Sequence, residues 1–211
     1  MVDDSAGSKE QSLRQLRREN KMLKERVADL EALAQRDPLT HIGNRRSFDR
    51  QLTTELERSL RSGQPTGLIL LDVDGLKGIN DSCGHAAGDA CLKSLARVLV
   101  AKVRLLDSIH RIGGDEFAIV LSGCSAEASD AVAHRLEAPP LLFDHNGEAR
   151  AFSISIGFAS AAASGVSVLD SAGKPVLVSP SCLAQKVSAD QLSANLLAAA
   201  DKALYLNKVQ R

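Results

Sequence analysis

The sequence of 211 residues contains no tryptophan, and aromatic residues make up only 3% of it. Because 44% of the residues are hydrophobic, a folded core would consist mainly of Leu, Ile, Val and Ala. No apolar run approaches the ~20 residues that a transmembrane helix requires, so we expect no membrane span. The N-terminus is polar and charged, unlike a secretory signal, and we therefore predict a cytoplasmic protein.

The chain also lacks an excess of charge, since 26 Lys and Arg residues balance 26 Asp and Glu residues. A neutral chain provides no basic field for nucleic acid and no polybasic membrane signal, so neither partner is expected. The few cysteines lie far apart without a Cys-x-x-Cys pair, which favours reduced thiols over a zinc site or a disulfide framework. They are Cys83, Cys91, Cys124 and Cys182.

Two adjacent glycines stand between two strand-like segments, residues 108–112 and 117–121. A Gly-Gly pair in this position predicts a two-residue hairpin, because glycine accepts the positive φ of such tight turns. The hairpin would carry Asp115 and Glu116 at its tip. Paired carboxylates at an exposed turn suit a divalent metal that carries phosphates. Taken alone, the pattern favours a simple polar turn.

A second acidic segment makes a metal site the better interpretation. Residues 66–71 form an apolar run, typical of a strand buried on both faces, and the run ends in Asp72-Val73-Asp74. On a strand, Asp72 and Asp74 would point the same way because they are two residues apart. Carboxylates at the end of a central strand, beside a carboxylate hairpin, would form a metal cradle.

The next segment contains a lysine, an asparagine, a histidine and an aspartate, which are Lys77, Asn80, His85 and Asp89. A lysine can hold a phosphate as a point charge. Asn and Asp together offer the donor and acceptor pattern that suits a purine edge. Each residue alone also has an ordinary explanation as a solvated charge, a helix cap or a loop residue.

Six sequence blocks together make this chain similar to the GGDEF family of diguanylate cyclases, which join two GTP molecules into cyclic di-GMP. The blocks occur in the family order between about residues 37 and 208. Six ordered blocks are much stronger evidence of the resemblance than a single motif match. They are residues 37–40, 44–48, 72–89, 111–117, 153–157 and 200–205.

The order of the predicted elements is β-α-β-β-α-β, which resembles the ferredoxin-like core of palm-type nucleotidyl cyclases. We therefore predict an α+β fold with a central antiparallel sheet. Segment 160–188 is longer than expected for the family and is interpreted as an extra surface hairpin. Helices are predicted over about 44–60, 86–102, 126–137 and 189–208, and strands over about 66–73, 108–112, 117–121, 141–143 and 151–159, with a tight turn at Asn146-Gly147.

The N-terminal segment carries a seven-residue repeat, in which Leu16, Leu23 and Leu30 each follow three residues after Leu13, Asn20 and Val27. This pattern predicts a coiled-coil dimerisation helix over residues 9–36, in which Asn20 fixes a parallel register. A single amphipathic helix packed on the domain is the alternative. Residues 1–8 are expected to be disordered, and residues 37–211 to form the cyclase domain. Since ring closure needs two facing GTP molecules, the resemblance implies a homodimer.

The resemblance also implies catalytic roles. Asp72, Asp115 and the carbonyl of Val73 would hold Mg²⁺, with Mn²⁺ as the alternative ion. Asp115 would also be the general base for the 3′-hydroxyl of GTP, and Glu116 would help to position the metal or that hydroxyl. Lys77 would hold phosphate charge and stabilise the transition state.

For the substrate, the resemblance implies that Asn80 and Asp89 bind the guanine edge, with His85 in the same pocket. An acid at position 89 accepts hydrogen bonds from N1-H and the N2 amine of guanine, which favours GTP over ATP. The phosphates would contact a second set of residues: the backbone of Gly75 and Leu76, and Lys208, which matches a lysine near the C-terminal end of the family pattern.

An Arg-x-x-Asp string, Arg104 to Asp107, is separated from Gly113 by the five residues 108–112, which is the family's spacing for a product-inhibition site. Arg135 would be a secondary contact there. The alternative is an ordinary salt bridge between residues i and i+3 at a helix end. Two other functions remain open: a non-catalytic cyclic di-GMP receptor that uses only this string, and a dimeric interaction module. The intact acids favour the enzyme.

Overall fold

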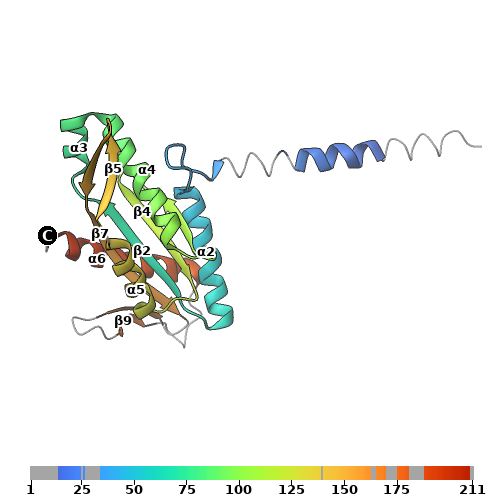
Figure 1. Cartoon of the computed structure of the whole chain (residues 1–211). Coiled ribbons are helices and arrows are strands. Elements are labelled where there is room, and N and C mark those ends of the chain that lie inside the picture. Colours follow the sequence, from blue (N-terminus) through green and yellow to red (C-terminus); the bar gives the residue numbers. More distant parts are fainter. Residues whose placement is uncertain are drawn as a thin grey trace, which may run out of the picture. The chain divides into compact units, whose positions relative to one another are not determined.

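The computed structural model describes residues 14–24, 26, 34–138, 140–162, 165–169, 175–180 and 188–209. The chain divides into two compact units, residues 1–36 and 37–211 (Figure 1). In the first unit, residues 14–24 are helical, and Leu16 and Leu23 are exposed. The remaining leucines of the repeat, Val27 and the segment 1–8 lie outside the described residues. The coiled coil therefore stays a prediction.

The second unit is built on one main sheet, to which seven described strands contribute in the order β1-β3-β4-β2-β7-β8-β9. All neighbours are antiparallel except β1 and β3. The strands are β1 (Gly43–Asn44), β2 (Thr66–Val73), β3 (Ser108–Arg111), β4 (Glu116–Ser122), β7 (Ile154–Ala162), β8 (Gly165–Leu169) and β9 (Pro175–Pro180). Strands β8 and β9 form the extra hairpin expected between residues 160 and 188, and they extend this sheet.

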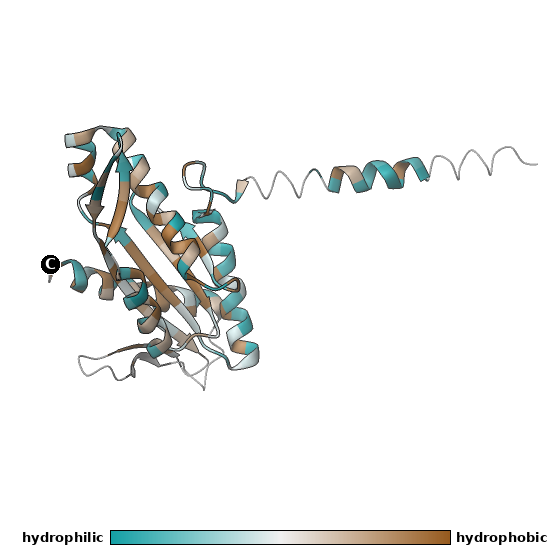
Figure 2. Ribbon diagram, viewed as in Figure 1, coloured by the Kyte–Doolittle hydropathy of each residue, from teal (hydrophilic) through white to brown (hydrophobic). Residues whose placement is uncertain are grey.

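Two pairs of helices cover the sheet. Helices α4 (His85–Lys102) and α5 (Ala126–Glu137) pack with Ile69 and Leu71 of β2, whereas α2 (Arg45–Ser62) and α6 (Ala189–Val209) pack with its Leu68 and Leu70. Because both faces of β2 are buried, its sequence is apolar without alternation. Figure 2 shows these hydrophobic residues along the central strand. The order β2-α4-β3-β4-α5-β7 confirms the predicted α+β, ferredoxin-like core.

One element prediction was wrong. The strand expected over residues 151–159 is two strands: β6 (Glu148–Phe152) pairs with β5 (Leu141–His145) around the Asn146-Gly147 turn, and β7 begins at Ile154. Alternating apolar residues continue through the break at Ser153, so periodicity could not reveal that the chain changes sheets there. The structure also adds helix α3 (Leu76–Cys83), which starts after Gly75 at φ 65°.

Helix α6 lies directly against the backbone of β7 at Gly157, where a Cβ atom would overlap backbone atoms of Ala200 and Leu204. Backbone cannot rotate away as a side chain can, so Gly157→Ala should lower the free energy of unfolding by about 3 kcal/mol. Chemical denaturation followed by circular dichroism measures this. Gly78→Ala, within α3 and with no atom within 4 Å of the added Cβ, should be neutral or stabilising. Equal stability of the two variants would disprove the close approach.

Candidate active site

Asp72 lies at the end of β2, on the face of the sheet that α6 covers, and only 8% of the residue is exposed. The ammonium group of Lys208, from the last turn of α6, lies 2.9 Å from Asp72 Oδ2. Burial raises the pKa of the Asp72 carboxyl, the hydrogen bond from Lys208 opposes this rise, and the nearby Asp115 charge adds to it. The structure thus brings three predicted site residues together from distant parts of the sequence.

Asp115 is held beside β2 by the backbone, because the Val73 N-H donates to the Asp115 carbonyl at 3.1 Å. The described residues contain no group of three or more His, Cys, Asp or Glu side chains that could hold a metal ion. Mg²⁺ commonly binds one or two carboxylates and completes its shell with waters and phosphates. The two acids therefore suit a magnesium-nucleotide site, and the nearby Lys208 is a candidate for binding phosphate charge.

Asp74 lies close to this pair, since its charge also raises the pKa of Asp72, and its carboxylate is hydrogen-bonded to two serines. Its Oδ2 accepts a hydrogen bond from Ser153 Oγ at 2.7 Å, and its Oδ1 accepts one from Ser155 Oγ at 2.6 Å. Strand β2 ends at Val73, so the alternation of strand side chains does not decide where Asp74 points. Its carboxylate instead attaches the end of β2 to β7.

Glu116 is the first residue of β4 and pairs with Asp72 across the sheet, so the expectation that it lies at the hairpin tip was wrong. The N-H groups of Ile112 and Gly113 donate to its carbonyl at 2.9 and 3.3 Å. The prediction of a two-residue turn at Gly113-Gly114 with positive φ was also wrong, because neither glycine has a positive φ. At Gly113, an added Cβ atom would come close to the Glu116 side chain, 3.1 Å from its Cβ atom.

An ion pair that the sequence analysis did not assign supports the hairpin. Arg111 Nη1 lies 3.3 Å from Asp37 Oδ1, while its Nη2 donates to the Gly114 carbonyl at 2.7 Å. Asp37 also accepts hydrogen bonds from the N-H and hydroxyl of Thr40. Burial alone would raise the pKa of Asp37, but Thr40 and Arg111 outweigh it and lower that pKa. Both residues lie in sequence blocks that match the family, so their place in those blocks could have identified them as site residues.

The predicted guanine residues come from two neighbouring helices. Asn80 of α3 lies over Gly88 of α4, where a Cβ would overlap its amide. Asp89 follows Gly88 and is exposed, as are Lys77 in the first turn of α3 and His85 at the start of α4. With Gly75 and Leu76 at the junction of β2 and α3, all six predicted contacts of this group lie on one continuous segment after Asp72.

The Arg-x-x-Asp string forms a turn after α4. Asp107 Oδ2 accepts the backbone N-H of Arg104 at 3.0 Å, and among the described residues no ion pair joins the Arg104 guanidinium to Asp107. Arg135 Nη2 donates to the Lys102 carbonyl at 2.9 Å, and Lys102 Nζ donates to the Arg135 carbonyl at 2.8 Å. Because Lys102 lies two residues before Arg104, the structure brings the ends of α4 and α5 together at the predicted inhibitory site.

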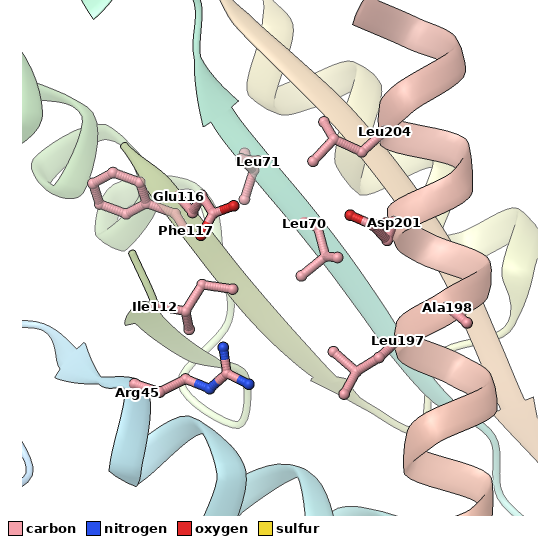
Figure 3. Close-up of a pocket in the computed structure, with 10 residues that line it drawn as sticks. All are labelled: Arg45, Leu70, Leu71, Ile112, Glu116, Phe117, Leu197, Ala198, Asp201 and Leu204. Carbon is pink, nitrogen blue, oxygen red and sulfur yellow. The ribbon is translucent and has the colours of Figure 1, made fainter. Parts of the chain in front are cut away.

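A pocket of about 330 Å³ lies beside Glu116 and was not anticipated from the sequence. Figure 3 shows the carboxylates of Glu116, from β4, and Asp201, from α6, pointing into it from opposite walls, with Arg45 of α2 at its edge. Leu70 and Leu71 of β2 contribute to its lining. The pocket places open space directly next to one of the predicted catalytic acids.

Comparison with known proteins decides the family. The model of the family described as "Diguanylate cyclase, GGDEF domain" matches residues 34–174, which is more than half of the chain. The chain belongs to the GGDEF family. Its GGDEF region is 42% identical over 103 residues to the probable diguanylate cyclase DgcE of Escherichia coli, a match that covers 49% of this chain and 9% of that protein.

A second curated GGDEF relative, the diguanylate cyclase DgcP of Pseudomonas aeruginosa, is 39% identical over 123 residues, covering 57% of this chain and 18% of that protein. The chain thus spans less than a third of the length of these relatives.

Solved GGDEF structures agree with the fold. The diguanylate cyclase SiaD of Pseudomonas aeruginosa, crystallised with its activator SiaC, has a TM-score of 0.68 and 26% identity, over 97% of this chain and 70% of that one. A sensory box/GGDEF family protein from Caulobacter crescentus has a TM-score of 0.65 and 29% identity, over 84% and 99% of the two chains. In the described part of the chain, no helix combines the length and hydropathy needed to cross a bilayer.

Proposed function

We propose that this chain is a diguanylate cyclase that condenses two GTP molecules into cyclic di-GMP and two pyrophosphates, as a homodimer in the cytoplasm. The observation that carries this proposal is the meeting of Asp72, Asp115 and Lys208 at the end of β2. Helix α3 begins shortly after that strand and α4 follows it, and the two helices carry the purine-edge residues. Two acids and a lysine next to a purine site suit a nucleoside triphosphate, whose phosphates and base need these groups.

Each residue has a definite task in this reaction. Asn80 and Asp89 hold the guanine, while Lys77 and Lys208 bind phosphate charge. Asp115 accepts the proton of the 3′-hydroxyl, whose oxygen attacks the α-phosphorus of the GTP on the partner subunit, and pyrophosphate leaves. A bound Mg²⁺, or Mn²⁺, would be held by Asp72, Asp115 and the Val73 carbonyl and would neutralise phosphate charge. Most of the rate enhancement then comes from positioning and from electrostatics.

The arrangement of Arg111 explains how the hairpin can be rigid enough for this chemistry. Its guanidinium bonds both to Asp37, at the first residue of the catalytic unit, and to the Gly114 carbonyl next to Asp115. Both side chains of the ion pair are about 15% exposed, so solvent competes little for it. Asp115 is therefore fixed from one side by Arg111 and from the other by Val73.

The direct test is incubation of the protein with GTP and Mg²⁺, followed by chromatography and mass spectrometry of the products. Cyclic di-GMP and pyrophosphate should form in a ratio of one to two, and chelation of the metal should stop the reaction. ATP in place of GTP should react much more slowly, because adenine cannot donate both hydrogen bonds that Asp89 accepts. Binding of cyclic di-GMP without any synthesis would instead support the receptor function.

We also propose that the product inhibits the enzyme through Arg104, Asp107 and Arg135. Asp107 already fixes the backbone of Arg104, whose side chain is exposed and can offer two parallel hydrogen bonds to a guanine edge or a phosphate. Arg104→Ala should raise the concentration of cyclic di-GMP for half-inhibition about tenfold or more, with little change in the initial rate. Arg97→Ala, an exposed arginine on α4, is the matched control. Unchanged inhibition of Arg104→Ala would reject this site.

A further inference from the structure

We propose that Lys208 is an internal counter-ion that keeps Asp72 from binding a free metal ion until a nucleotide draws the lysine away. This inference rests on the proposed function, because it assigns Lys208 two successive partners at that site. The first partner is the Asp72 carboxylate, at 2.9 Å. The second is the polyphosphate of the incoming GTP. Transfer of the lysine from one to the other would make metal binding depend on nucleotide binding.

The ion pair between Lys208 and Asp72 competes with a metal ion for the Asp72 carboxylate. The Asp72 side chain is only 11% exposed, so few directions of approach to its carboxylate remain. An ammonium group in direct contact occupies one of its oxygens and repels a second cation at the same place. A divalent ion that binds without nucleotide must therefore separate this pair at a partly buried site, where water replaces the lost contact poorly.

The Lys208 side chain can move although its helix cannot. Leu204 is buried, and the contact at Gly157 leaves no space between α6 and β7. Asn207, next to Lys208, accepts the backbone N-H of Ile156 through its Oδ1 at 3.3 Å, which fixes the last turn of α6 to β7. The Lys208 side chain itself is 42% exposed, and its four-carbon stem rotates freely. Motion is thus confined to one side chain.

A triphosphate offers the lysine a multivalent anion in place of a single carboxylate, so that bound nucleotide releases Asp72 for the metal. Because binding linkage is reciprocal, the metal strengthens nucleotide binding by the same factor. The site would then fill with metal and nucleotide together, and the two acids would not retain a metal ion without substrate.

The test measures Mn²⁺ binding by the full chain with electron paramagnetic resonance, so that turnover is not needed. Titrations are run without nucleotide and with a GTP analogue that carries a methylene group between its α and β phosphorus atoms. Lys208→Met should bind Mn²⁺ without nucleotide about tenfold more tightly than the wild type, a change of about 1.4 kcal/mol. The gain in Mn²⁺ affinity that the analogue produces should fall by a similar factor.

Matched variants make the outcome decisive. Lys202→Met removes an exposed lysine from the same helix and should behave like the wild type, and Lys208→Arg should retain the coupling. Lys208→Gln provides a second neutral side chain should the methionine variant fold poorly, which circular dichroism would reveal. If both neutral variants bind Mn²⁺ without nucleotide no more tightly than the wild type, the counter-ion role is wrong, even if cyclic di-GMP is made. A protein that shows the predicted Mn²⁺ effect but makes no cyclic di-GMP would reject the cyclase proposal alone.

Discussion

Asp115→Asn should reduce the formation of cyclic di-GMP at least about a thousandfold while the fold and the dimer persist. The proposal gives this carboxylate two tasks, proton acceptance from the 3′-hydroxyl and metal binding, and a general base alone typically contributes 10²–10⁴. Asparagine has nearly the same shape but neither the charge nor the basicity. The backbone hydrogen bond from Val73 to the carbonyl of residue 115 does not involve the side chain, so the hairpin should keep its position.

The measurement is the initial rate of cyclic di-GMP formation by chromatography, with thermal denaturation as a check of folding. Asp190→Asn, which removes an exposed acid in the first turn of α6, is the matched control and should keep nearly full activity. Glu116→Gln should also lose activity, since Glu116 lies across from Asp72 in the sheet. Turnover of Asp115→Asn at the wild-type rate would be incompatible with the catalytic role proposed for this site.

The double substitution Leu16→Asp and Leu23→Asp should lower the rate per subunit about a hundredfold at submicromolar protein, with recovery as the protein concentration rises. We propose that these two leucines form the seam of a parallel coiled coil, with Asn20 setting its register. Both are more than 60% exposed in the single chain, which leaves their apolar surface available to a second copy. Aspartates in the seam would separate the helices and remove the tether between two catalytic units.

Sedimentation velocity and the dependence of the rate on protein concentration test this effect together. Gln15→Asp with Met22→Asp is the control, because it adds the same two charges with the same seven-residue spacing but outside the proposed seam. Met22 is 67% exposed, much like the two leucines. Monomeric protein with an undiminished rate at low concentration would contradict the requirement for a dimer.

Local patterns predicted most of the elements correctly, because they depend on residues close in sequence. The apolar run of β2 predicted a strand buried on both faces, and Asn44 caps α2 by accepting the Ser47 N-H at 3.1 Å. The Asn146-Gly147 turn has φ of 57° and 81°, as such dipeptides favour. The break at Ser153 escaped detection because hydrophobic alternation does not show which strand a segment pairs with.

The active site shows the same difference between what local sequence patterns predict and what they miss. The family blocks were sufficient to nominate Asp72 and Asp115, and the C-terminal end of the family pattern nominated Lys208. No pattern indicated that Lys208 contacts Asp72, 136 positions earlier in the sequence. Likewise, no pattern indicated that the Asp74 carboxylate accepts hydrogen bonds from Ser153, just before β7, and from Ser155 within it. Pairings of this kind depend on the three-dimensional packing of distant segments.

By itself, the sequence determined the family, the α+β class, most helix and strand positions, and the residue types available for binding a metal and a purine nucleotide. These properties follow from short-range periodicity and from motifs whose spacing is visible in one dimension. Only the tertiary structure decided that Glu116 begins a strand, that Arg111 joins Asp37 to the hairpin, and that Lys208 neutralises Asp72. The reason is that electrostatic and steric contacts depend on distance in space, which the close packing of α6 on β7 sets for Lys208.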